Sequence, residues 1–150
     1  MFDRGQLFGI TNGVITMLAL ITGLYATRVP KVGIIGAILS LLIADPLCDA
    51  YSMYIAEKGV GNKEAFITGR NAFLYQFILQ FLFLSIVIIS PKISQGVFWS
   101  YIFGLIITIV YGVYTSTSAV DIIKHLLGIF TLVCITYLSD TFVYKFFKKK

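Results

Sequence analysis

Four side chains that can bind a cation follow one another at four-residue steps within a long apolar stretch of this chain. They are Asp45, Asp49, Met53 and Glu57. Because successive residues of an α-helix are turned by about 100°, each step of four advances only about 40° around it. We therefore expect all four side chains on one stripe of a helix. Carboxylates at membrane depth are costly, and ionisable residues there usually mark an ion or proton path.

The atoms on this stripe indicate which cation it would bind. Carboxylate oxygens alone suit Mg²⁺, Ca²⁺ or Mn²⁺, whereas the thioether of Met53 shifts the preference towards softer transition metals. Plain packing is the alternative role for that methionine. Pro46 lacks an N–H, which predicts a kink and leaves the carbonyl of Leu42 free beside Asp45. This combination predicts a site for Fe²⁺ or Mn²⁺.

Polar residues in other apolar stretches could complete or line such a site. Asn12 offers one carbonyl oxygen and two N–H donors, and interhelical hydrogen bonding is its alternative role. Gln76 and Gln80 lie one helical turn apart and could line a path or form hydrogen bonds between helices. Gly9 and Gly13 have the GxxxG spacing that permits close approach of another helix.

The overall composition predicts that these residues lie in a membrane protein. Of the 150 residues, 58% are hydrophobic and 13% are charged, and the mean hydropathy is +0.90, which excludes an ordinary soluble domain. A helix needs about 20 apolar residues to cross a bilayer core. We therefore expect a single all-α integral membrane domain, multi-pass and in the cell membrane if the source is prokaryotic. The five expected transmembrane helices cover residues of about 7–25, 32–57, 70–89, 97–114 and 119–146.

The net charge of +5 owes much to lysines near the C-terminus, namely Lys145, Lys148, Lys149 and Lys150. A basic tail suits an anionic lipid surface, and no basic domain accompanies it that would indicate nucleic-acid binding. The sequence contains no nucleophile–base arrangement, no Gly-rich phosphate loop and no HExxH spacing. We therefore expect neither an enzyme nor a prosthetic group.

Three segments of the chain are similar in sequence to one family of membrane transporters. The first, Gly9-Ile-Thr-Asn-Gly13, matches a first-helix pattern of Gly–x–x–Asp–Gly except at Asn12. The second, Ala50-Tyr-Ser-Met53 with Glu57, is similar to a second-helix motif in which Ser-Met is followed by Gly-Glu-Tyr. The third is Gly128-Ile-Phe-Thr-Leu-Val-Cys-Ile-Thr-Tyr-Leu, which is similar to the last helix. By these segments the chain resembles the vacuolar iron transporter family.

The resemblance implies proton-coupled export of Fe²⁺, and often Mn²⁺, from the cytoplasm by a homodimer. It assigns Asp45 and Met53 to the intramembrane metal site. Asn12 stands where the family has an acid, and Asp49 could supply the missing charge. Glu57 would lie at the mouth as a further metal ligand or proton acceptor. The family's Glu-rich metal-binding domain between helices two and three is replaced here by a short connection.

The alternative function is that of a small, non-transporting membrane subunit with a buried polar seam. Such an assembly or interaction subunit would explain the short connection and the absence of an acid at Asn12. It explains less readily why two acids accompany an intramembrane proline.

Overall fold

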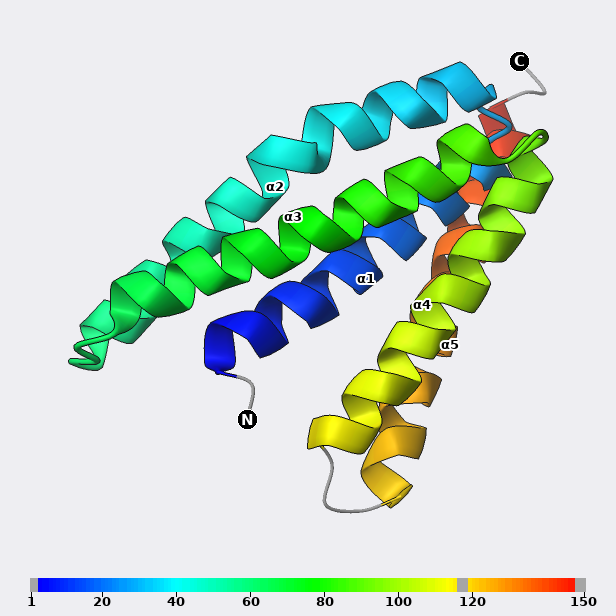
Figure 1. Cartoon of the computed structure of the whole chain (residues 1–150). Coiled ribbons are helices and arrows are strands. Elements are labelled where there is room, and N and C mark those ends of the chain that lie inside the picture. The colour runs from blue at the N-terminus through cyan, green and yellow to red at the C-terminus, as the bar shows by residue number, and fades with distance from the viewer. Residues whose placement is uncertain (1–2, 116–118, 148–150) are drawn as a thin grey trace.

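Five helices make up the described part of the computed structural model, residues 3–115 and 119–147 (Figure 1). They are α1 (Arg4–Ala26), α2 (Lys31–Gly59), α3 (Ala65–Ile89), α4 (Ile93–Thr115) and α5 (Ala119–Phe147). Each contains a stretch long and apolar enough to cross a membrane. No strand occurs in the described ranges. The expected all-α class is confirmed, as is the expectation of five helices long and apolar enough to span a membrane.

The helices extend a few residues beyond the expected spans. For example, α3 begins at Ala65 rather than near residue 70, and the Thr68 N–H donates to the Glu64 carbonyl oxygen at 3.0 Å in its first turn. At the start of α1, Asp3 Oδ1 accepts from the Gln6 N–H at 2.8 Å, and Gln6 Oε1 accepts from the Asp3 N–H at 2.9 Å. This reciprocal capping box fixes where α1 begins. The lysines of residues 148–150 lie outside the described residues.

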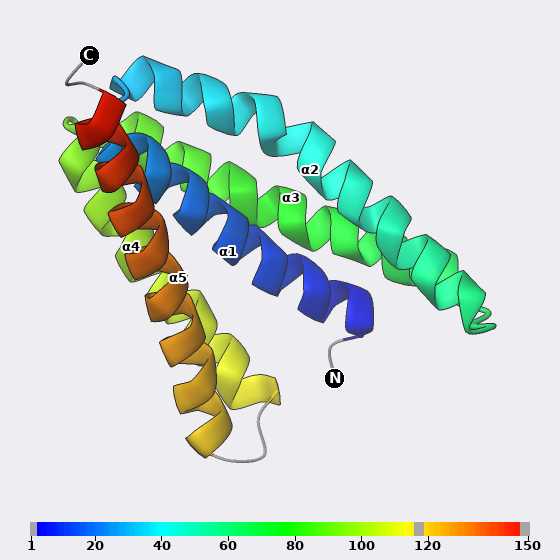
Figure 2. The ribbon, with the colours of Figure 1, turned by 180° about the vertical axis from the view of Figure 1, so that it is seen from behind.

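The helices form two groups that meet at one end and separate towards the other (Figures 1 and 2). In the first group α3 packs against both α1 and α2, and in the second α4 and α5 lie side by side. The buried core includes Met17, Ile21, Ile38, Phe83 and Val87. This core therefore lies among α1, α2 and α3, towards the end where the two groups of helices meet.

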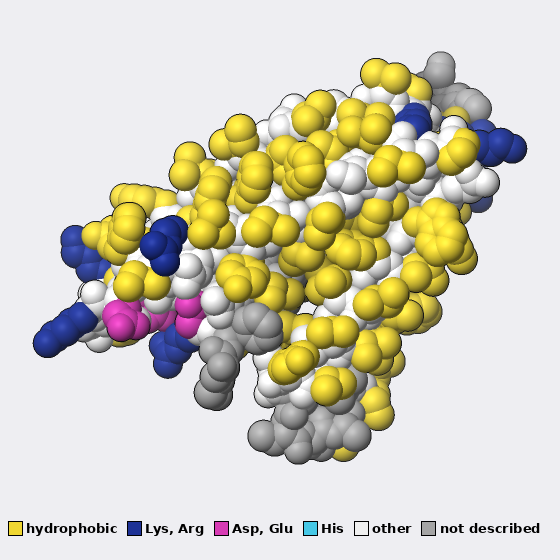
Figure 3. Space-filling view, in the orientation of Figure 1, with side chains coloured by type: hydrophobic (Ala, Val, Ile, Leu, Met, Phe, Trp, Pro, Cys, Tyr) yellow, Lys and Arg dark blue, Asp and Glu magenta, His cyan; other side chains and the backbone are white. Residues whose placement is uncertain are grey.

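On the face shown in Figure 3, charged side chains lie mainly at the ends of the helices, with hydrophobic side chains between them. At one end, Lys31 Nζ donates to the carbonyl oxygens of Ile88 at 2.9 Å and Ser90 at 2.7 Å. This ammonium satisfies carbonyls at the C-terminus of α3, where the helix dipole favours a positive charge. The distribution is the one expected for helices that cross a bilayer.

Glycines allow α1 and α3 to approach each other very closely. A Cβ atom built on Gly5 would lie 1.9 Å from the Thr68 carbonyl oxygen, and one built on Gly9 would lie 2.4 Å from the Ala72 carbonyl oxygen. A Cβ on Gly13 would lie 3.5 Å from the Cα of Gln76. The close helix contact predicted from the GxxxG spacing is confirmed, and it brings the middle of α1 directly against α3.

Candidate cation site

Two acids and three carboxamides meet where α1, α2 and α3 pack together at mid-length. Asp45 lies at the midpoint of α2 and Asp49 one turn further along. Gln76 and Gln80 lie near the midpoint of α3, and Asn12 comes from the stretch of α1 held against α3 by glycines. We call these five residues the acid–amide cluster.

Hydrogen bonds tie the two carboxylates to all three amides. The Nε2 group of Gln76 donates to Oδ2 of Asp45 and to Oδ2 of Asp49, each at 2.8 Å. Gln80 Nε2 donates to Asp45 Oδ2 at 2.6 Å, and Asn12 Nδ2 donates to Asp49 Oδ2. One amide therefore bridges both acids, and each Oδ2 atom accepts two hydrogen bonds.

The two acids of the cluster have no cationic side chain paired with them in the described part of the chain. Among the described residues the single ion pair joins Arg4 and Glu57, so neither Asp45 nor Asp49 has a cationic partner there. The amides that bind the acids are neutral donors, which stabilise a carboxylate but leave its charge uncompensated. In hydrocarbon, an unbalanced carboxylate is costly by about 2.5–3.5 kcal/mol on insertion scales.

Two carboxamide oxygens of the cluster are also unpartnered. Gln76 and Gln80 are fully buried, and in the described part of the chain neither Oε1 atom has a hydrogen-bond donor. Buried polar atoms in folded proteins are nearly always hydrogen-bonded or bound to an ion or water. Surplus charge and surplus acceptor oxygens at one place are what a bound cation would satisfy.

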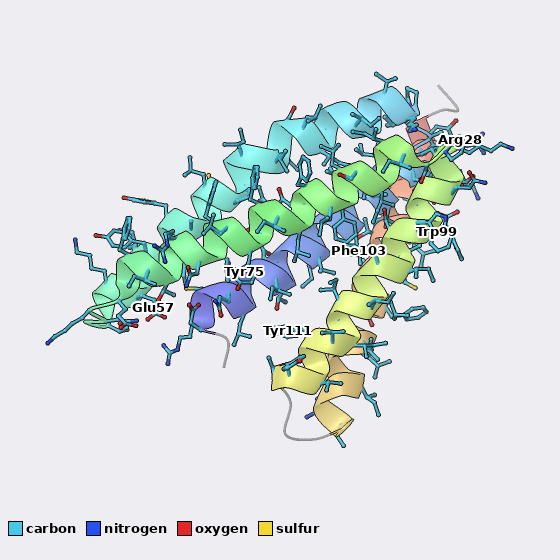
Figure 4. All side chains as sticks on the ribbon, viewed as in Figure 1. Arg28, Glu57, Tyr75, Trp99, Phe103 and Tyr111 are labelled. Atoms are coloured by element: carbon cyan, nitrogen blue, oxygen red, sulfur yellow. The ribbon has the colours of Figure 1, made fainter. Side chains whose placement is uncertain are left out.

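Two of the five residues predicted for the site lie further along α2. Met53 is half-buried, one turn or roughly 6 Å along the axis beyond Asp49. Glu57 is buried and lies near the far end of α2 (Figure 4). At the rise of an α-helix, eight residues place it roughly 12 Å along the axis from Asp49. Its carboxylate accepts from Arg4 Nη1 at 3.4 Å and from Asn62 Nδ2 at 2.6 Å. Of the five residues predicted for the site, the structure thus brings together three, Asn12, Asp45 and Asp49.

No protein-family model, curated protein or solved structure matches this chain. The function must therefore be argued from the site itself.

The side chains that the structure brings together offer oxygen atoms that were not part of the predicted site. Within the described residues, no three carboxylate, imidazole or thiol groups lie together, so the groups that supplement the acids are carboxamides. From the sequence, Gln76 and Gln80 could either line a path or form hydrogen bonds between helices. The structure places both glutamines against the acids. The signal for this was their four-residue spacing in the middle of an apolar helix. Carboxylate and carboxamide oxygens suit hard cations such as Mn²⁺.

The cluster is closed on the side of α3 and more open on the side of α2. Gln76 and Gln80 are fully buried, whereas Asp45 and Asp49 are only half-buried. Beside the acids, α2 presents a row of exposed small residues at four-residue steps. This small-residue stripe comprises Gly36, Ser40, Ala44, Cys48, Ser52 and Ala56. Small residues on a membrane helix permit close packing against another helix.

Proposed function

We propose that this protein is a multi-pass membrane transporter of a divalent metal, Mn²⁺ or Fe²⁺, and that the acid–amide cluster is its intramembrane binding site. The observation that carries the proposal is the pair of half-buried carboxylates at the midpoint of α2, bound by neutral donors alone among the described residues. A divalent cation would balance both charges. The oxygen donors favour Mn²⁺, and the resemblance to the vacuolar iron transporters favours Fe²⁺ and Mn²⁺ alike.

The proposed transport couples metal movement to protons. A metal ion binds deprotonated carboxylates, so protonation of Asp45 and Asp49 would release it. Beyond them, Met53 and Glu57 continue the same stripe to the end of α2. An ion moving along that stripe would pass Met53 and reach the mouth at Glu57, where it would replace Arg4 as the carboxylate's positive partner. The family resemblance gives the direction as export from the cytoplasm.

The open side of the cluster supports a homodimer as the transporting unit. Asp45 and Asp49 lie next to the small-residue stripe, which no other part of the described chain covers. If two copies pack through this stripe, each copy shields the other's half-buried carboxylates from lipid. Close packing of small residues is a common basis of helix association in membranes.

Cysteine cross-linking should detect this dimer without any added residue. Cys48 lies exposed on the stripe, so a mild oxidant should join two copies through Cys48 in a lipid bilayer. Cys134→Ser should leave the cross-link intact and Cys48→Ser should abolish it, as read on a non-reducing gel. A single-copy particle that transports metal would contradict the dimer.

Reconstitution into liposomes tests the proposed function itself. With a metal-sensing dye inside the vesicles, we expect Mn²⁺ or Fe²⁺ flux that depends on the protein and responds to an imposed pH gradient. Mg²⁺ and Ca²⁺ serve as comparison ions. Absence of flux and of binding for all of these cations would contradict transport and favour the non-transporting subunit instead.

Replacing Asn12 by an acid should tighten metal binding. Asn12→Asp puts a third carboxylate beside Asp49, so Mn²⁺ affinity should rise about 10-fold while metal-free stability falls through like-charge repulsion. Asn71 makes the same kind of amide-to-carboxylate hydrogen bond, to Asp3 at the end of the bundle. Asn71→Asp is therefore the matched control, with destabilisation expected and affinity unchanged. Calorimetric titration with Mn²⁺ measures the affinity, and unfolding temperatures measure the stability. An Asn12→Asp protein whose Mn²⁺ affinity does not rise would contradict the assignment of Asn12 to the site.

A further inference from the structure

We propose that Gln76 and Gln80 are direct cation ligands that reach the ion by turning over their carboxamide groups. This proposal rests on the proposed function and names the part of the site that lies on α3. In the structure both amides point their Nε2 groups at the acids, and their Oε1 atoms are buried without a donor in the described part of the chain. That orientation suits a site without a cation, because N–H donors stabilise bare carboxylates.

When a cation lies between the acids, the end of each amide that faces the acids most favourably changes from the NH₂ group to the carbonyl oxygen. The NH₂ group carries partial positive charge and would repel the ion, whereas the carbonyl oxygen carries partial negative charge and can coordinate it. Rotation by a half-turn about the last side-chain bond exchanges the two ends while the planar group keeps its shape. The exchange therefore leaves the shape of the fully buried side chains of Gln76 and Gln80 unchanged.

The two glutamines occupy positions that allow them to act together. Gln76 bridges Asp45 and Asp49, and Gln80 binds Asp45 alone. When both amides turn, their oxygens face the same carboxylates that their N–H groups faced before. The loaded site then contains two anionic and two neutral oxygen ligands from α2 and α3, a set that favours hard divalent ions over soft ones.

The sign of a change in affinity separates a ligand from a simple donor. If Gln80 serves only as a donor to Asp45, its N–H competes with the cation, and Gln80→Met should increase Mn²⁺ affinity. If Gln80 is a ligand, Gln80→Met should reduce Mn²⁺ affinity about 10-fold. Gln76→Met should change the Mn²⁺ affinity in the same direction as Gln80→Met. Gln95→Met is the matched control because Gln95 is exposed near the start of α4, far from the acids along the chain.

Calorimetric titration of the full-length protein in lipid nanodiscs with Mn²⁺ measures these affinities. Wild-type protein that does not bind Mn²⁺ or Fe²⁺ would overturn the proposed function and this inference together. Wild-type binding combined with unchanged or increased affinity in both glutamine variants would overturn the inference alone. A decrease in the two site variants, with no change in Gln95→Met, supports it.

Infrared spectroscopy of the unmutated protein gives a second readout that does not depend on whether the variants fold. With ¹³C in the glutamine side-chain carbonyls, coordination should lower the stretching frequency of part of the labelled band when Mn²⁺ is added. The same shift should persist in Gln95→Met. Saturating Mn²⁺ that leaves the labelled band unchanged would overturn coordination by the amides.

Discussion

Asp45→Asn is expected to reduce the Mn²⁺ affinity about 100-fold or more and to reduce metal flux to the background of empty liposomes. Asp45 accepts from both glutamines of the cluster and supplies one of its two negative charges. The substitution should also raise the unfolding temperature of the metal-free protein. An Asn oxygen still accepts the same hydrogen bonds, while the uncompensated charge, costly by about 2.5–3.5 kcal/mol in a bilayer, is removed.

Opposite changes in stability and binding are the distinguishing feature of this prediction. A residue that only stabilises a polar seam should lower the unfolding temperature when it is replaced and leave cation binding at its starting level. Glu64→Gln makes the same chemical change at an exposed position between α2 and α3. We expect that control to alter neither quantity. A metal-free Asp45→Asn protein that is less stable and still binds Mn²⁺ normally would contradict the cation site.

Gly9→Ala is expected to lower the free energy of unfolding by about 1–3 kcal/mol and to weaken Mn²⁺ binding. The new methyl group would lie 2.4 Å from the Ala72 carbonyl oxygen and 3.1 Å from the Gln76 backbone nitrogen. Both atoms belong to the backbone of α3, so no side-chain rotation relieves the clash and the two helices must separate. Separation moves Asn12 away from Gln76 and widens the acid–amide cluster.

A glycine in open surroundings provides the control for this prediction. Gly128→Ala on α5 introduces the same methyl group where, among the described residues, no atom outside its own helix backbone and chain neighbours lies within 4 Å. Its stability should remain within about 0.5 kcal/mol of wild type. Chemical unfolding in mixed micelles, followed by Mn²⁺ titration of the folded fraction, measures both effects. Equal stabilities for the two variants would mean that α1 and α3 are not held at the distance seen here.

The fold was predictable because bilayer thickness and hydropathy together restrict the possible elements. Apolar stretches of about 20 residues predict membrane helices, and the structure has the five expected helices, each long and apolar enough to cross a membrane. The ends were less predictable, since a helix can continue past the apolar stretch when local caps satisfy its backbone. At Asp3 and Gln6 the cap is visible as a sequence pattern only after one knows that α1 begins there.

Periodicity correctly placed the acids on one stripe but gave no information about which other helices face that stripe. The pairing of α2 with α3 decides that Gln76 and Gln80 lie beside Asp45 and Asp49. The packing of α1 against α2 likewise places Arg4 beside Glu57 at the end of the bundle. Contacts between residues distant in the chain depend on packing, which a single sequence does not reveal through spacing alone.

Two of the three amides that donate to the acids follow them in the chain, and this order affects how the chain can enter a membrane. Gln76 and Gln80 follow Asp45 by 31 and 35 residues, so the ribosome completes α2 before either amide of α3 exists. An isolated α2 would have to place two carboxylates in hydrocarbon without these donors, which insertion scales penalise heavily. We infer that α2 remains at the translocon until α3 arrives and that the two helices pass into lipid as a hairpin. The same carboxylates that would bind the cargo would thus also set the order of biosynthetic insertion.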